Sequence, residues 1–201
     1  MVSNWIHKRP IVLILSTLML VLLSGCKFQW GHIGYNTGYQ PDQPIPFSHE
    51  LHAGKYKMDC LYCHSNVEKS KHSSVPSLNV CMNCHRIVKA DSPHIQKLQA
   101  AYDEGGTINW VKVHMLPDHV KFNHKRHVKF LANSENRAQA CQTCHGQINQ
   151  MEVVHQESSL SMGWCINCHR DPTEFIPTEL QKNYTEAGSP KGKLNCTTCH
   201  H

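Results

Sequence analysis

Cys60-Leu61-Tyr62-Cys63-His64 is the stretch that decides the fold of this chain, because its pattern, Cys-x-x-Cys-His, occurs five times. The other copies begin at Cys81, Cys141, Cys165 and Cys196. Two cysteines three residues apart lie about one helical turn apart, so both can form thioether bonds to the same haem. The histidine that follows can then bind the haem iron as its proximal ligand. The pattern therefore predicts five covalently attached c-type haems.

Each copy supplies two attachment residues and one ligand. The predicted attachment residues are Cys60, Cys63, Cys81, Cys84, Cys141, Cys144, Cys165, Cys168, Cys196 and Cys199. The predicted proximal ligands of the haem iron are His64, His85, His145, His169 and His200. A zinc ribbon or a disulfide framework also uses paired cysteines, but neither gives a reason for a histidine after every pair. Haem attachment is therefore the favoured interpretation.

The composition agrees with a core that is not made of side chains alone. The 201 residues include 11 Cys and 17 His, but only 4 Trp, 6 Tyr and 5 Phe. Part of the 40% apolar fraction lies in one N-terminal run, so few core-forming residues remain elsewhere. We expect a mostly α-helical and irregular fold with little or no β-sheet, in which the haems form the core. The net charge of +5 is too small and too dispersed to indicate nucleic-acid binding.

The first 26 residues have the pattern of an export signal or a membrane anchor. Lys8-Arg9 precede an apolar run over residues 11–23, which is followed by Ser24-Gly25-Cys26. Three interpretations stay open: a lipid on Cys26, a retained transmembrane helix, or an ordinary cleaved signal. The uncharged span that ends at Cys26 would be roughly 25 Å long as a helix, which is marginal for crossing a bilayer. Under the first two interpretations the rest of the chain lies on the periplasmic side of the bacterial cytoplasmic membrane and is held to it.

A histidine pair precedes the first and the third copies in the same setting. Phe47-Ser48-His49-Glu50-Leu51-His52 matches Phe122-Asn123-His124-Lys125-Arg126-His127. Histidines at i and i+3 project from roughly the same face of a helical turn, but an iron with a proximal ligand has only one axial position left. We therefore expect each pair to bind two different irons, which makes His49, His52, His124 and His127 predicted distal ligands.

The fifth distal ligand has two candidates just before the second histidine pair. His114 is favoured and His119 comes next, while Met162 is an alternative thioether ligand for one iron. Other histidines are expected to be exposed or hydrogen-bonded: His72, His94, His155 and His201.

The repeat also sets the expected domain organisation. Leu98-Gln99-x-x-Tyr102-x-Glu104 is echoed by Leu180-Gln181-x-x-Tyr184-x-Glu186. We expect one helix from Pro93 to the glycines after residue 104 and a shorter counterpart over residues 177–184. The expected parts are a signal or anchor (1–26), a linker (27–45), a first dihaem module with a helical connector (46–120), a second dihaem module (121–190) and a fifth haem-binding segment (191–201).

Several motifs beyond the bare haem pattern resemble one family. They are Phe47-Ser48-His49-x-x-His52-Ala53-Gly54, the copy at 81–85, the run from Trp110 through Val113-His114-x-Leu116-Pro117-Asp118 to His127, and Met162-Gly163-Trp164 with the copy that follows it to Arg170. Together they resemble the pentahaem cytochrome c subunit of alternative complex III, over nearly the whole chain after residue 40. The resemblance also supports distal roles for His49, His52, His114, His124 and His127.

The resemblance implies a periplasmic subunit of a membrane complex that oxidises quinol. It implies as partners an iron–sulfur subunit related to molybdopterin oxidoreductases, quinol-binding membrane subunits, a monohaem cytochrome c subunit and a terminal oxidase. It also implies a retained N-terminal transmembrane helix.

We expect an electron-transfer subunit without a catalytic site of its own. Two alternatives stay open: a stand-alone membrane-anchored quinol dehydrogenase, and a multihaem reductase of a small nitrogen or sulfur compound. A reductase needs an iron with an open distal position, and the supply of histidines does not require one.

Overall fold

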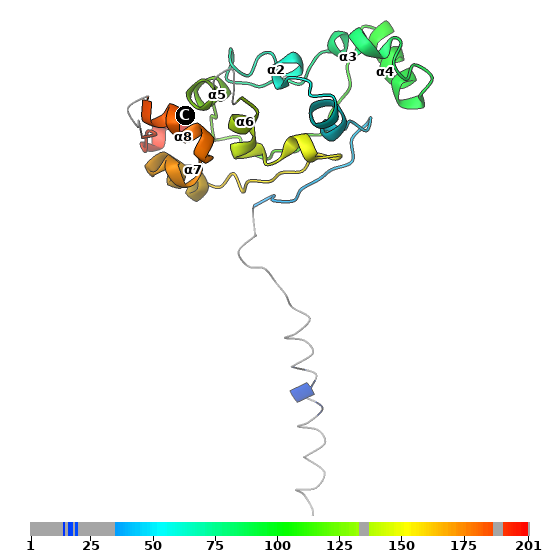
Figure 1. Cartoon of the computed structure of the whole chain (residues 1–201). Coiled ribbons are helices and arrows are strands. Elements are labelled where there is room, and N and C mark those ends of the chain that lie inside the picture. The colour runs from blue at the N-terminus through cyan, green and yellow to red at the C-terminus, as the bar shows by residue number, and fades with distance from the viewer. Residues whose placement is uncertain are drawn as a thin grey trace, which may run out of the picture. The chain divides into compact units, whose positions relative to one another are not determined.

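The computed structural model describes residues 14, 16, 17, 19, 35–132, 137–186 and 191–200 (Figure 1). The chain divides into two compact units, Met1–Gly34 and Tyr35–His201. In the first unit the described residues are helical, and the Thr17 hydroxyl donates a hydrogen bond to the Ile14 carbonyl at 3.0 Å. None of the helices in the described ranges is long and apolar enough to cross a membrane. Lys8, Arg9 and Cys26, on which the anchor and lipidation predictions depend, lie outside the described residues.

The second unit is helical, and its described residues contain no β-strand, which confirms the mostly helical part of the expected fold. Its elements in chain order are η2 (Glu50–Lys55), α2 (Cys60–Cys63), α3 (Leu78–His85), α4 (Pro93–Asp103), α5 (His124–Leu131), α6 (Arg137–His145), η3 (Ile148–Gln150), α7 (Met162–Arg170), η4 (Pro172–Glu174), α8 (Thr178–Glu186) and α9 (Cys196–Cys199). The segments between them are irregular, and residues 35–46 contain no helix, as expected for the part of the linker that is described.

Every Cys-x-x-Cys-His copy lies on a short helix: α2, α3, α6, α7 and α9. Local capping explains where some of these helices begin. The Asp59 carboxylate accepts a hydrogen bond from the Leu61 amide at 2.7 Å at the start of α2. Likewise, the Ser161 hydroxyl accepts from the Trp164 amide at 3.2 Å at the start of α7. Such caps satisfy amide groups that have no partner inside the helix, so each cysteine pair is held within one turn.

The two helices expected from the repeat are both present. Helix α4 has Pro93 at its first position and ends just before Gly105, whose φ of +65° continues the chain in the left-handed region. Helix α8 is its shorter counterpart, with 9 residues against 11. The echoed leucines occupy equivalent buried positions, since Leu98 is 5% and Leu180 is 1% exposed.

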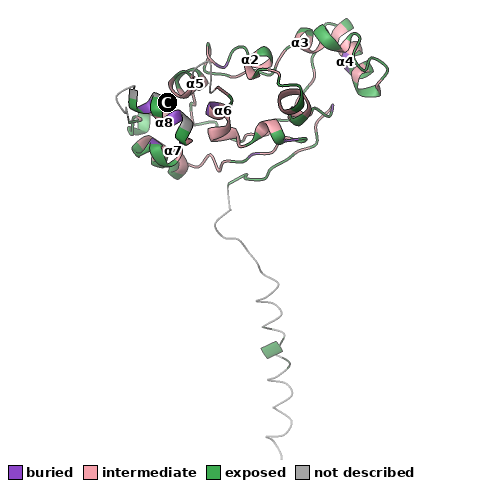
Figure 2. Cartoon of the chain, viewed as in Figure 1, coloured by how far each residue is buried: buried purple, intermediate pink, exposed green. Residues whose placement is uncertain are grey.

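Apolar side chains form two separate small clusters rather than one continuous core. Leu98 packs with Ile45 and Met82, and partly buried residues of α3 and α4 surround them. Leu180 and Tyr184 pack with Ala140 and Ile176 in the second cluster. Figure 2 shows that buried residues are confined to small patches and that most of the described backbone is intermediate or exposed. Clusters of this size leave most of the stabilisation of the unit to be supplied by something other than aliphatic packing.

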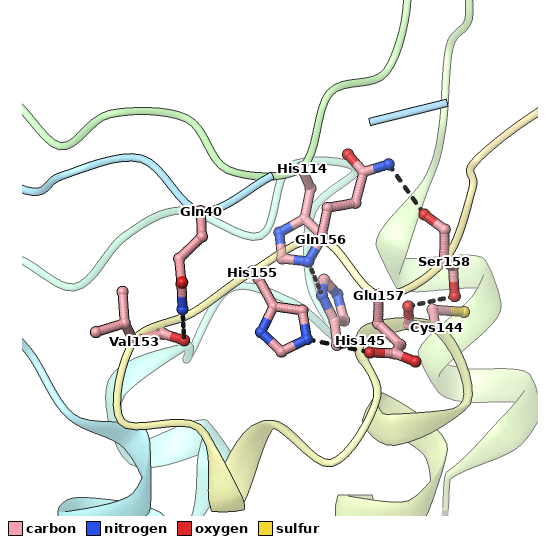
Figure 3. A network of polar contacts seen from close by, with 9 residues as sticks. All are labelled: Gln40, His114, Cys144, His145, Val153, His155, Gln156, Glu157 and Ser158. Carbon is pink, nitrogen blue, oxygen red and sulfur yellow. Dashed lines mark hydrogen bonds and ion pairs between the residues drawn. The ribbon is translucent and has the colours of Figure 1, made fainter. Parts of the chain in front are cut away.

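Gln156 is fully buried and joins three segments that are distant in sequence. Its side-chain oxygen accepts from the Met115 amide at 2.8 Å. Its side-chain nitrogen donates to the Ser158 carbonyl at 2.9 Å (Figure 3). Its backbone amide donates to the Tyr39 carbonyl at 3.0 Å, and its carbonyl accepts from the Gly38 amide at 2.7 Å. Gln156 therefore fixes the linker and the loop that carries His114 against the second half of the chain.

Gln156→Leu is expected to lower the free energy of unfolding by about 2–4 kcal/mol, because it removes two part-buried hydrogen bonds, to the Met115 amide and the Ser158 carbonyl, at about 1–2 kcal/mol each. Urea unfolding of the purified protein measures this loss. Gln40→Leu is the matched control, since Gln40 is exposed and its side chain donates a single hydrogen bond to the Val153 carbonyl. Equal stability of the two variants would show that Gln156 is not a structural junction.

Candidate haem sites

We number the sites in chain order from site 1 (60–64) to site 5 (196–200). In each site a second imidazole lies near the histidine of the Cys-x-x-Cys-His copy. The ring-centroid distances are 6.4 Å for His49–His64 at site 1, 6.2 Å for His52–His85 at site 2, 4.4 Å for His114–His145 at site 3, 6.1 Å for His127–His169 at site 4 and 5.4 Å for His119–His200 at site 5.

Three of these distances fit a six-coordinate haem iron. Two imidazoles on opposite sides of a metal, with metal–nitrogen bonds of about 2 Å, have ring centroids about 6 Å apart. The pairs at sites 1, 2 and 4 have this spacing. The pair at site 5 is closer at 5.4 Å, and at site 3 the two rings touch edge to face at 82°. The residues present therefore fit haem ligation directly at three sites, and at the other two the rings would have to separate.

The orientation of the rings supports the same assignment. In seven of the histidines at these sites Nδ1 lies 2.8–3.2 Å from a backbone carbonyl. A carbonyl only accepts, so Nδ1 carries the proton and Nε2 keeps the lone pair that binds a metal. The bonds are His52 to Ser48, His64 to Ser74, His85 to Val88, His124 to Lys71, His127 to Asn123, His169 to Lys193 and His200 to His119.

Two histidines depart from this arrangement. Nδ1 of His49 is buried and has no hydrogen-bond partner. Nδ1 of His145 lies 3.0 Å from Nε2 of His114 instead of facing a backbone carbonyl (Figure 3). Unpaired buried polar atoms are rare in folded proteins and indicate an additional group at the site.

Burial keeps the ring nitrogens in the form that binds metal. Burial, together with the nearby charges of His114 and His124, lowers the pKa of His145 to about 3. The pKa of His49 is lowered to about 4 by burial and by His64 and His52. Burial likewise lowers the pKa values of His114, His124 and His127. Neutral imidazole is the ligand form of histidine.

The ten cysteines of the five copies are not joined by disulfides. Several of them lie close to a cysteine of another site. A hydrogen bond between the Cys60 and Cys141 side chains lowers the pKa of Cys60 to about 7 and raises that of Cys141. Within the described ranges no group of three or more His, Cys, Asp or Glu side chains is arranged to hold a metal ion. What the sites provide is a pair of thiols and a pair of opposed imidazoles.

Residues 120–201 match the family described as cytochrome c7 and related cytochrome c. This part of the chain is a cytochrome c7-like multihaem domain. It contains the copies at sites 3, 4 and 5 together with α5. A cytochrome of this kind carries c-type haem, which agrees with the thiol and imidazole pairs.

A relative covers more of the chain. It is the multihaem cytochrome c subunit of menaquinone reductase from Nitratidesulfovibrio vulgaris, 28% identical over 165 residues that make up 80% of this chain and 69% of that protein. The similarity therefore extends beyond the cytochrome c7-like domain into the first half of the chain.

The structure separates the members of each Phe-x-His-x-x-His pair as the spacing suggests. His49 directly precedes η2 and faces His64, whereas His52 lies within η2 and faces His85. In α5, His127 faces His169 of the cytochrome c7-like domain, and His124 lies near His145. The members of each pair thus face different sites, and their roles as iron ligands stay predictions.

The fifth distal position is where the structure adds most to the sequence analysis. His119, the second choice, lies against His200 of site 5, and its carbonyl accepts from the His200 ring. His114, the first choice, contacts His145 at site 3, where His124 also lies nearby. The contact between His119 and His200 spans 81 residues of sequence, so no local spacing reveals it.

The remaining residues of interest lie away from the proximal histidines. His72 and His94 are exposed, and His155 forms an ion pair with Glu157 at 3.1 Å, as expected for histidines that are not ligands. Met162 is 67% exposed at the start of α7, which gives no support to a thioether ligand there. His201 lies outside the described residues.

Gly192 lies directly against His169, the predicted proximal ligand of site 4. A Cβ atom at this position would lie 2.2 Å from Cγ of the His169 ring, far inside van der Waals contact. The Gly192 amide also donates to the His169 carbonyl at 3.0 Å. The chain can therefore pass behind the site 4 ligand only where it has no side chain.

Proposed function

We propose that this chain is a periplasmic electron-transfer subunit that carries five covalently attached c-type haems. The observation that carries the proposal is that every Cys-x-x-Cys-His copy lies on a helix and has a second imidazole opposite its histidine. An enzyme that reduces a small molecule needs an iron with an open axial position, and the paired imidazoles favour transfer over catalysis.

The haem supplies one-electron chemistry at iron, and the residues of this chain hold and tune it. The cysteine pairs fix each attachment point to one helical turn. The paired imidazoles would bind the iron, and backbone carbonyls hold seven of the rings in the tautomer whose Nε2 can bind a metal.

We further propose that the chain is a subunit of a membrane quinol:acceptor oxidoreductase of the alternative complex III type. The motifs around His49, His114 and Met162 support this assignment. The proposed partners are an iron–sulfur subunit related to molybdopterin oxidoreductases, quinol-binding membrane subunits, a monohaem cytochrome c and a terminal oxidase. Residues 1–26 would attach the chain to the periplasmic face of the membrane, by a helix or by a lipid on Cys26.

A second candidate is a subunit of a complex that reduces menaquinone. The name of the relative, a multihaem cytochrome c subunit of menaquinone reductase, favours this alternative. The two candidates share the quinone and the haems and differ in the direction of electron flow. The complex purified through a tag on this chain separates them, because a quinol oxidase module reduces added cytochrome c with quinol. A menaquinone reductase instead oxidises a periplasmic electron donor and forms quinol.

Intact mass spectrometry of the native protein tests the proposal at its base. We expect the mass of the chain plus five haems. The haem absorbance should also stay with the protein after extraction with acidified acetone, because thioether bonds are not broken by the solvent. The control variant Cys196→Ala/Cys199→Ala should carry one haem fewer. The same spectrum distinguishes a retained N-terminus from a trimmed and lipidated Cys26. A colourless protein, or colour that is extracted into the solvent, would contradict five covalent haems.

A further inference from the structure

We infer that the five sites form a single unbranched row in the order 2–1–3–4–5, with site 2 and site 5 at its ends. The order therefore differs from the order of the copies in the sequence, since the first copy lies inside the row. This inference deepens the proposed function and rests on it, because the row matters only when the sites carry haem. Four neighbouring pairs have to be established, and each has its own contacts.

Sites 2 and 1 are joined through their helices and through η2. The Asn83 side chain on α3 donates a hydrogen bond to the Tyr62 hydroxyl on α2 at 3.0 Å. His49 and His52, three residues apart, face the histidines of site 1 and site 2 respectively.

Sites 1 and 3 are joined by an ion-pair bridge. Arg137, at the start of α6, lies 3.3 Å from the Asp59 carboxylate and 3.2 Å from the Glu68 carboxylate, on either side of site 1. This bridge holds the first turn of α6, which leads into the copy at site 3, against the segments on both sides of the copy at site 1.

Sites 3 and 4 meet at helix α5. His127 on this helix faces His169 of site 4. Phe130 and Leu131 on the same helix pack against the apolar cluster that contains Ala140 of α6, the helix of site 3. Helix α5 therefore joins the helix of site 3 to the ligand of site 4.

Sites 4 and 5 are joined by the segment that leads into α9. The Gly192 amide donates to the His169 carbonyl at 3.0 Å, and the His169 ring lies 3.0 Å from the Lys193 carbonyl. Residues 191–195 therefore connect His169, the predicted ligand at site 4, to the last Cys-x-x-Cys-His copy at site 5.

Figure 1 shows the elements that carry the sites in this order, with α3 and α4 at one end, α2 and α6 between, and α7 and α8 at the other end. The position of η2 explains why site 1 lies inside the row although its copy comes first in the sequence. The histidines at and within η2 face both sites of the first module, and α6 then packs against site 1 and not against site 2.

The order is tested by marking one site and removing another. His49→Ala is expected to leave the iron of site 1 without its distal imidazole, and His127→Ala does the same at site 4, so each produces a high-spin signal in electron paramagnetic resonance. Each marked protein is combined with removal of site 2 (Cys81→Ala/Cys84→Ala) or removal of site 5 (Cys196→Ala/Cys199→Ala). The reduced fraction of the marked iron is then followed in a redox titration. Intact mass first confirms four haems in each deletion variant.

Removal of site 2 should change the ratio of reduced to oxidised iron at marked site 1 by about threefold or more at a fixed potential, and leave marked site 4 unchanged, because charge interactions fall with distance. Removal of site 5 should do the opposite. The order is overturned if marked site 4 responds to loss of site 2, or if marked site 1 responds to loss of site 5. A protein without covalent haem would instead fail at the mass measurement, which identifies a failure of the proposed function and not of the order.

Discussion

His127→Ala is expected to convert one of the five haems from low-spin to high-spin and to leave the other four in the low-spin state. His127 is part-buried in α5, its ring stacks at 24° to His169 with 6.1 Å between centroids, and its Nδ1 faces the Asn123 carbonyl at 2.8 Å. Alanine removes the imidazole without disturbing the proximal histidine. Electron paramagnetic resonance of the oxidised protein measures the change, and electron transfer through the protein should slow at the same time.

The matched control for this substitution is His94→Ala. His94 lies on α4, is exposed, and faces no histidine of a Cys-x-x-Cys-His copy. Its replacement should leave all five haems low-spin. An unchanged spectrum for His127→Ala, or equal effects of the two variants, would mean that α5 does not supply a distal ligand to site 4.

Local spacing predicted those parts of the sites that depend on one turn of helix. The cysteine pairs, the histidine that follows them and the separation of His49 from His52 all follow from the geometry of three- and four-residue steps. The helices α4 and α8 followed from a proline start, a glycine end and an echoed leucine. In each case the decisive residues lie within about a dozen positions of one another.

The parts that could not be predicted depend on contacts between distant segments. His119 reaches site 5 because Lys121 is bound to the Cys199 carbonyl by a backbone hydrogen bond of 2.7 Å, far along the chain. Gln156 holds the loop of His114 by a bond across 41 residues. The sequence therefore ranked His114 before His119 without showing that His114 contacts His145 and that His119 contacts His200. The π-helical form of η2 likewise has no signal in its sequence.

The apolar fraction predicted the nature of the core better than its location. Two clusters around Leu98 and Leu180 are all that the described residues assemble into apolar cores. Site 3 adjoins the second of them, because Ala140 of that cluster directly precedes Cys141 on α6. If haem completes the interior, then an inner site and an outer site should contribute to stability very differently.

Removal of site 3 by Cys141→Ala/Cys144→Ala is accordingly expected to abolish folding, whereas removal of site 5 by Cys196→Ala/Cys199→Ala should leave a folded protein with four haems. Burial raises the pKa of Cys144 to about 12, while Cys196 is exposed. Losing a large buried group leaves a cavity whose cost exceeds the usual stability of a domain, about 5–15 kcal/mol. Haem-stained yield, resistance to protease and thermal unfolding report the outcome. Comparable yield and protease resistance in the two variants would show that the haem at site 3 is not part of the core.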